Sequence, residues 1–367
     1  MKKFFAIFLS VVLFIGVINL CGCKSEDKGA NSSNTNKVET TNTNNAQTRK
    51  HYNVNVQGTS FDNMKYYGFM GIEVNKFYYY QESPNEGLYV SNFDGTGKIK
   101  LIDGLVHDIN FVGDKFYYVK DEFVSKTKSD LKDLYTFNLY LYNSYTGKTE
   151  KLIENCGQIY VTDKYIYYLY DVDTIAYNYD EKHIPDNQSY LYRYNINDKK
   201  SELIVNEPVC DYLIINDKVL YTKSNQDYID KIYSVAINTT EHEKSVFYDG
   251  KNLSENGIDY FTVDDKGHIL IYDDEKVLSY DNVTDSIQIL YDVSSNKTLD
   301  LDKVIIYDNY LYAFNNQKTI IRINLTNHNS EKLFTVDNYD GSLSYLYLFD
   351  NECCYFDGRN TPVFINP

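Results

Sequence analysis

The chain has 367 residues, a formal net charge of −16, 39 tyrosines and no tryptophan. An acidic chain without a basic cluster repels a phosphate backbone, so we expect no binding to nucleic acid. The six cysteines form no Cys-x-x-Cys pair and no mixed Cys/His spacing, which argues against a zinc site. Residues 51–367 exceed the usual size of one compact core and require two domains or a repeat architecture.

The chain begins like an exported protein. Lys2 and Lys3 precede an uncharged, largely apolar run from Phe4 to Leu20. A short basic segment followed by such a run is typical of a signal peptide. The run is only marginally long enough for a permanent transmembrane helix. We therefore expect a signal peptide over residues 1–22, with an uncleaved transmembrane anchor as the alternative.

The residues Leu20-Cys21-Gly22-Cys23 resemble the lipobox of bacterial lipoproteins. The resemblance implies that Cys23 is diacylated through sulfur, that the chain is cut before it, and that the new amino terminus is acylated. Several acyl chains on one residue give durable anchoring, here to the extracytoplasmic face of the cell membrane. Lys24–Lys50 is rich in Asn, Thr and Ser and nearly lacks apolar side chains, so we expect residues 23–50 to form a disordered linker.

From residue 51 onward, short apolar and aromatic strands recur in pairs, and each pair is joined by a turn with Asp or Asn. These turn residues recur every 40 to 54 residues or so, which is about the period of a four-stranded propeller blade. They are Asn75, Asp114, Asp163, Asp217, Asp265, Asp308 and Asp350.

A second hairpin follows the first in each unit but the last, as in Leu88–Ile102 and Leu139–Ile153. Gly95 and Gly147 stand where tight hairpin turns need a positive φ. Four strands per unit and seven units predict an all-β, seven-bladed β-propeller over residues 51–367. Six blades or a pair of β-sandwiches remain as alternatives, because both give many short strands.

The last unit contains two strands and a third, Pro362–Asn366, but no fourth. Tyr52–Gln57 alternates apolar and polar residues and precedes the first unit without a partner of its own. Pairing this segment with the last unit would remove both exposed sheet edges. We therefore expect it to close the ring.

Two motifs recur in this region. One is the Leu-Tyr pair of the second hairpins, and the other is the turn Asp-Lys-aromatic-Tyr-Tyr, as in Asp114–Tyr118. The pattern resembles a family of extracytoplasmic propellers, a domain of unknown function distantly like the YWTD propeller of the low-density-lipoprotein receptor. The resemblance covers residues 51–367 and implies a fold and an extracytoplasmic location, not a chemistry. The YWTD signature itself is absent, since the chain has no tryptophan.

Four aspartates occupy one equivalent position, near the start of the innermost strand of their units. In a propeller they would converge on the mouth of the axial channel, where carboxylates favour a hard cation such as Ca²⁺ or a cationic ligand. The alternative is that they cap strand starts by bonding backbone amides. The four are Asp108, Asp211, Asp259 and Asp302.

Two connections, Lys120–Phe137 and Asp171–Ser189, are much longer than their counterparts and would lie on the same face as the aspartates. Long loops on a rigid scaffold often carry function, although a tolerated insertion is the alternative. The second connection offers candidate partner contacts, namely Tyr177, Tyr179, Asp180 and His183.

Cys156 and Cys210 share one blade position on adjacent units, where Cα atoms are usually too far apart for a disulfide. We expect two buried free thiols.

These observations predict a lipid-anchored extracytoplasmic lipoprotein whose propeller binds an unknown ligand or envelope partner without catalysis and without a cofactor. One alternative is a propeller enzyme, a metal-assisted hydrolase or lyase with its site at the channel mouth. The other is a structural envelope scaffold.

Overall fold

The computed structural model describes residues 70–365, except 127–132, 172–188, 224–228, 293–298, 336–344, 357–362 and shorter breaks at turns. All described residues fall within the unit Arg49–Pro367. The signal peptide, Cys23, the linker and Tyr52–Gln57 therefore lie outside the described residues. Within the described part of the chain, no helix is long and apolar enough to cross a membrane.

Among the described residues, six antiparallel sheets have four strands each, hydrogen-bonded in chain order. The first three are β1 (Met70–Glu73), β2 (Lys76–Gln81), β3 (Gly87–Ser91) and β4 (Ile99–Asp103); β5 (Val106–Val112), β6 (Lys115–Lys126), β7 (Asp133–Asn143) and β8 (Lys148–Glu154); and β9 (Cys156–Val161), β10 (Tyr165–Asp171), β11 (Ser189–Asn195) and β12 (Lys200–Val205).

The next three sheets repeat this connectivity along the chain. They are β13 (Val209–Ile215), β14 (Lys218–Lys223), β15 (Ile232–Ala236) and β16 (Lys244–Tyr248); β17 (Tyr260–Val263), β18 (Ile269–Asp273), β19 (Lys276–Asp281) and β20 (Ser286–Asp292); and β21 (Leu299–Tyr307), β22 (Tyr310–Asn315), β23 (Thr319–Asn324) and β24 (Ser330–Thr335). We number these sheets as blades one to six. A last sheet has three strands, β25 (Tyr345–Phe349), β26 (Glu352–Phe356) and β27 (Val363–Ile365).

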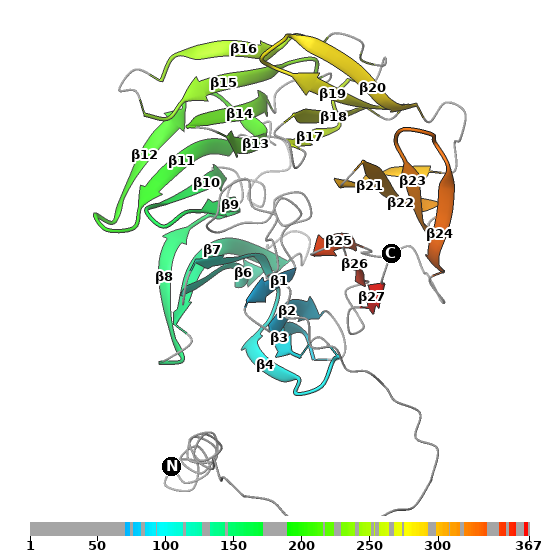
Figure 1. Cartoon of the computed structure of the whole chain (residues 1–367). Helices are drawn as coiled ribbons and strands as arrows, with labels where there is room; N and C mark the ends of the chain where they lie inside the picture. The colour runs from blue at the N-terminus through cyan, green and yellow to red at the C-terminus, as the bar shows by residue number, and fades with distance from the viewer. Residues whose placement is uncertain are drawn as a thin grey trace, which may run out of the picture. The chain divides into compact units, whose positions relative to one another are not determined.

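The sheets follow one another around a common centre, with the first strand of each sheet innermost (Figure 1). Neighbouring innermost strands contact each other, as β1 does β5, β5 does β9, and β21 does β25. The fold is therefore a β-propeller. This arrangement confirms the predicted fold class and excludes the alternative of two β-sandwiches.

The predicted number of seven complete blades is not confirmed, because six sheets have four strands and the last has three. Six blades was the alternative drawn from the sequence. The prediction counted first hairpins, and the seventh first hairpin is present as β25 and β26. A complete blade also needs a second hairpin, of which only β27 is described.

A β-bulge recurs between the third and fourth strands of all six blades. In blade one, Leu88 pairs with Ile102 and Tyr89 with Lys100, so that Leu101 is an extra residue on the outer strand. The residue at which the register shifts is apolar and 0 % exposed in every blade. These residues are Leu88, Leu139, Leu191, Ile232, Val277 and Ile320.

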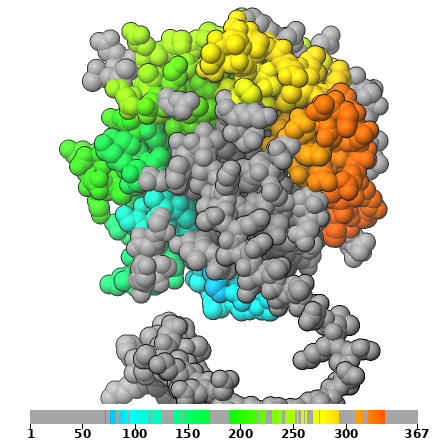
Figure 2. Space-filling model, viewed as in Figure 1, coloured from blue at the N-terminus to red at the C-terminus, as the bar shows by residue number. Residues whose placement is uncertain are grey.

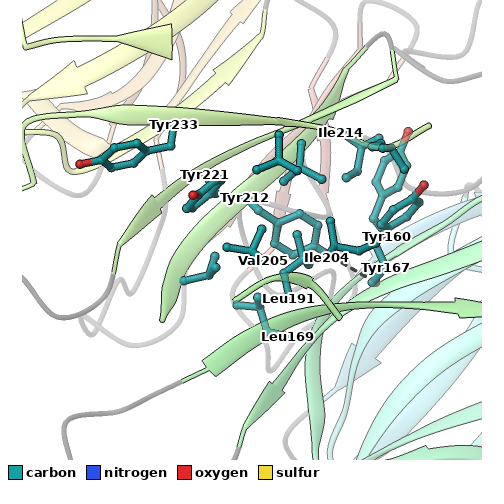
Figure 3. Packing of buried hydrophobic residues seen from close by; sticks show 14 residues of the cluster. Tyr160, Tyr167, Leu169, Leu191, Ile204, Val205, Tyr212, Ile214, Tyr221 and Tyr233 are labelled. Carbon is teal, nitrogen blue, oxygen red and sulfur yellow. Dashed lines mark hydrogen bonds between the residues drawn. The ribbon is translucent and has the colours of Figure 1, made fainter. Parts of the chain in front are cut away.

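The hydrophobic core lies between adjacent sheets. One cluster joins blades three and four and includes Leu191, Val205, Tyr212 and Tyr221, whose side chains meet between the two sheets (Figure 3). Burying one such large apolar side chain contributes about 1.5–3 kcal/mol. Many of the tyrosines are buried in these clusters, so core packing accounts for much of their abundance.

Candidate functional site

The second blade carries a buried polar cluster where its innermost strand begins. The register of β5 against β6 shifts between His107 and Asn110, and Asp108 lies in this bulge with a φ of 51°. His107 and Asp108 are 8 % and 2 % exposed, respectively. A left-handed backbone at a non-glycine residue is unusual and needs support from its surroundings.

His107 is held between two carboxylates. Its Nδ1 lies 3.0 Å from Asp108 Oδ2, and its Nε2 lies 3.1 Å from Asp121 Oδ1 on β6. Burial alone lowers the pKa of His107, but the hydrogen bonds and charges of Asp108 and Asp121 outweigh it and raise the pKa to about 9. The imidazole is therefore a cation at neutral pH, compensated on both sides.

The same cluster ties three blades together. Asp108 Oδ2 accepts a hydrogen bond from the backbone N–H of Gln158 on β9, at 3.0 Å. The Tyr212 hydroxyl on β13 donates to the carbonyl oxygen of Gln158 and, at 3.1 Å, to that of Tyr167. Figure 3 shows Tyr212 reaching toward Tyr167 across the interface between blades three and four. Asp108 thus binds a neighbouring backbone amide, as the capping alternative predicted.

The four predicted aspartates do not share one environment. Asp108 is buried and hydrogen-bonded, while Asp211 lies at the equivalent bulge of β13 with partial exposure. Asp259 is exposed and precedes β17, where its backbone N–H donates to Tyr272 O at 2.9 Å. Asp302 lies on β21, and its side chain is outside the described part. A cation held jointly by the four aspartates remains a prediction.

Asp211 differs from Asp108 because no cation compensates it at short range among the described contacts. Burial raises the pKa of Asp211 to about 7, and the hydrogen bond from the Tyr212 backbone N–H opposes this only in part. Within the described residues, no three His, Cys, Asp or Glu side chains are grouped to hold a metal ion.

The first predicted loop, Lys120–Phe137, is instead largely a β-hairpin. Val106, the first residue of β5, pairs with Lys120, and β6 then continues to Lys126 with only β7 as partner. The pairs run from Asp121–Phe137 to Lys126–Asp133, because the alternation of side chains in this segment supports two strands. The hairpin therefore projects from the face on which the innermost strands begin.

A hydrogen-bonded network on β7 and β8 supports the base of this hairpin. Glu122 accepts hydrogen bonds from Asn138 Nδ2 at 2.5 Å and from the Tyr140 hydroxyl at 2.5 Å. Lys151 Nζ lies 3.1 Å from the same carboxylate. Phe123, the next residue, is 53 % exposed. The residues Tyr177, Tyr179, Asp180 and His183 of the second predicted loop lie outside the described residues.

The cysteine prediction is confirmed in part. Cys156 and Cys210 are both free thiols, and Cys156 is buried. Burial raises the pKa of Cys156 well above its ordinary value. The expectation that Cys210 is buried is wrong, since this residue is exposed. The reason is the bulge of β13, in which Cys210 and Asp211 together lie opposite Thr222, between the pairs Val209–Lys223 and Tyr212–Tyr221.

Comparison with known proteins supports the fold and goes no further. No family model and no curated protein matches the chain. An oligogalacturonate lyase in complex with manganese has a TM-score of 0.54 and 13 % identity, over 79 % of this chain and 85 % of that one. The oligogalacturonate lyase of Vibrio parahaemolyticus gives 0.54 and 12 %, over 82 % and 89 %.

A puromycin-hydrolysing peptidase of Mycobacterium tuberculosis has a TM-score of 0.51 and 8 % identity. The match covers 79 % of this chain, which spans 50 % of the length of that peptidase. At such identities these likenesses show a shared propeller fold alone.

The His107 cluster should make stability depend on pH. A pKa raised in the folded state gives a stabilisation that is complete below about pH 6.5 and is lost as the pH rises to about 9. The loss should be roughly 3 kcal/mol in the free energy of unfolding, measured by urea denaturation at both pH values. His107→Gln should remove this pH dependence, and His268→Gln should keep it. An unchanged slope in His107→Gln would contradict the assignment.

The two equivalent aspartates should respond oppositely to removal of their charge. Asp108→Asn leaves His107 with one carboxylate and should destabilise the fold by about 3 kcal/mol, since it breaks a buried ion pair. Asp211→Asn removes a desolvated charge and should stabilise the fold at pH 8 by about 2 kcal/mol after allowance for partial exposure. The gain should shrink as the pH falls below about 7 and should vanish only below about pH 3.8, where the carboxyl is protonated in both the folded and the unfolded chain. Thermal melts of both variants at pH 8 and at a pH below 7 decide this, and equal shifts would refute it.

Proposed function

We propose that this protein is a lipid-anchored extracytoplasmic lipoprotein whose propeller binds an envelope partner without catalysis. The partner would bind on the face where the innermost strands begin. The observation that carries this proposal is the hairpin of β6 and β7, which extends past Val106 on that face. Binding residues are often placed on such projections from a rigid scaffold.

The hairpin is held in place before any partner arrives. The contact between Asp121 and His107 fixes one strand to the innermost strand, and Glu122 fixes it to Asn138 and Tyr140. A preorganised element loses little conformational entropy on binding, which favours affinity. Phe123 adds an exposed aromatic side chain beside these anchored residues. Aromatic side chains of this kind are enriched in protein interfaces.

The polar cluster beneath the hairpin supports binding rather than chemistry. Both ring nitrogens of His107 bind carboxylates, and Asp108 also accepts the Gln158 backbone N–H. These hydrogen bonds hold three neighbouring blades together. Such a cluster can support a binding face structurally. The enzyme alternative would need these groups to bind substrate instead.

The anchoring part of the proposal rests on the sequence Leu20-Cys21-Gly22-Cys23. A flexible tether of the length of Lys24–Lys50 has an end-to-end distance on the order of 30 Å, which would let the propeller search the space near the membrane. A tether of this reach is consistent with a protein that binds a partner in the same cell envelope.

Lipidation is tested by Cys23→Ala. The variant should stay unprocessed and should take up no radiolabelled palmitate, because no other cysteine follows a lipobox. A Cys21→Ala variant is the matched control and should be labelled and processed like the natural chain. Palmitate labelling of the Cys23→Ala protein would contradict lipidation at this residue.

Partner binding is tested by site-specific photocrosslinking in intact cells. A benzoylphenylalanine at position 123 should give one reproducible adduct, since this side chain is exposed on the hairpin. The same group at position 283 is the control, because Val283 is 87 % exposed in the turn between β19 and β20, at the opposite ends of the strands. Identical adducts from both positions, or none from position 123, would contradict a binding face at the hairpin.

We further propose that Tyr52–Gln57 supplies the fourth strand of the last sheet and so completes a seventh blade. Support comes from the three strands β25–β27 and from the alternation of that segment. Deleting residues 24–57 should lower the melting temperature by several degrees or cause aggregation, since it would expose a sheet edge. Deleting only 24–50 should leave the melt unchanged. Equal melts of the two truncations would rule the closure out.

A further inference from the structure

The fourth strand of each complete blade is the edge of its sheet. In the part of the chain that the structure describes, each of these strands is hydrogen-bonded on one side only, to the third strand. The other side of an edge strand presents backbone N–H and C=O groups that can pair with another extended chain. Proteins commonly prevent such pairing with charged side chains on the edge strand, above all lysine. The charge of each outer strand therefore decides how open its edge is to pairing.

Five of the six outer strands carry a charge beside their bulge. The strand register makes the blades comparable, because every bulge is followed by the same run of pairs between the third and fourth strands. In five blades a lysine or glutamate lies at the first of these pairs or within the next two. These residues are Lys100, Lys151, Glu202, Lys244 and Lys332.

The outer strand of blade five, β20, is the exception. Ile289 pairs with Leu278 directly after the bulge, and Gln288 and Ile287 occupy the next two pairs. The whole stretch Ser286–Leu290 contains no charged residue. Ile289 is 50 % exposed, and Gln288 is exposed as well. The edge of β20 thus lacks the charges that protect the edges of the other blades.

Exposed apolar side chains gather on the same hairpin. Among the described residues, five large apolar side chains are exposed, and two of them, Val283 and Ile289, belong to the turn and outer strand of the hairpin of β19 and β20. Figure 1 shows β20 as the outer strand of blade five, which forms the yellow surface in Figure 2. An uncharged sheet edge with exposed apolar side chains is typical of an interaction site.

We propose that the outer edge of β20 binds an extended, basic segment of a partner polypeptide, which adds a fifth strand to blade five. A polypeptide is the ligand whose backbone donors and acceptors repeat at the spacing of an edge strand. Ile287 and Ile289 lie on one face of β20, because side chains alternate along a strand. Apolar side chains at every second position of the added strand would pack beside them. This site is separate from the hairpin of β6 and β7 and does not rest on the proposed function.

Charge favours a basic partner over a second copy of this chain. Each copy has a formal net charge of −16, so two copies repel each other. At the turn beside β20, the hydrogen bonds from Thr284 Oγ1 and the Val283 N–H lower the pKa of Asp281 and keep its charge. Antiparallel pairing of two β20 strands would bring two such acidic chains together. Lysine or arginine residues flanking the added strand would instead be attracted.

Fluorescence anisotropy with the full-length chain in detergent tests the proposal. The probe is Lys-Thr-Val-Thr-Val-Thr-Lys-amide with a neutral dye on its amino terminus, and it should bind. Proline in place of both valines keeps the charge but removes two backbone donors, so this peptide should show no binding. Glutamate in place of both lysines should weaken binding at least about tenfold.

Each peptide decides one part of the proposal. No binding of the valine peptide, or equal binding of the proline peptide, would overturn pairing at a sheet edge. Equal binding of the glutamate peptide would overturn the choice of a basic partner.

The variant Ile289→Lys places on blade five the lysine that blades one, two and six carry. It should weaken binding of the valine peptide at least about tenfold, because an edge lysine opposes pairing and repels a basic strand. Its melting temperature should change by no more than a few degrees, since Ile289 is half exposed. Ile99→Lys is the matched control, at a 60 % exposed isoleucine on the outer strand of blade one, and should bind normally. Unchanged affinity in Ile289→Lys, or an equal loss in Ile99→Lys, would overturn the site.

Analytical ultracentrifugation of the full-length chain in excess detergent separates a partner from a second copy. The chain should sediment as a monomer at concentrations at which the valine peptide binds. A dimer that Ile289→Lys dissociates would assign the edge of β20 to a second copy and would overturn the proposed partner.

Discussion

The bulge between the third and fourth strands is the constraint on which the rest of this propeller depends. At each bulge a fully buried apolar residue faces two residues of the outer strand, as Leu139 does Leu152 and Ile153. The extra residue increases the local twist of the sheet, and a twisted sheet can pack both faces against its neighbours. Cores between sheets then replace one central core, which lets a long chain stay folded without exceeding the size of a single core.

Stacking around a centre brings the starts of the innermost strands together, and a second set of bulges shapes them. The register shifts in β5, β9 and β13 leave Asp108, Gln158 and Asp211 outside the regular pairing. Polar groups at a bulge are not paired by the regular hydrogen bonds of the sheet. They need other hydrogen-bond partners, because burying an unpaired polar group costs free energy. Asp108 finds them in His107 and in the Gln158 amide of the next blade. The polar site is therefore a consequence of how the blades are joined.

The sequence predicts the parts of this fold that rest on local pattern. The apolar residue before tyrosine, as at Leu88 and Leu191, marked the third strands, and Gly147 marked a turn with positive φ. Equivalent turns at Lys199, Asp285 and His328 also have positive φ but lack a glycine, and carry no such signal. The environments of Asp108 and Asp211 were beyond prediction, because Asp121, Gln158 and the exact position of each bulge come from distant pairings. The number of complete blades could not be predicted for the same reason, since completion of the last sheet depends on long-range strand pairing.

Strand pairing also positions the charged groups of the outer strands. In blade three, Arg193 of the third strand lies over the Tyr165 ring of the second strand and binds Glu202 of the fourth. Arg322 makes the equivalent contacts in blade six. Because the sheet already holds these groups side by side, the contacts cost little further conformational entropy. Each arginine thereby joins three strands of one sheet and reinforces the register that the bulge imposes.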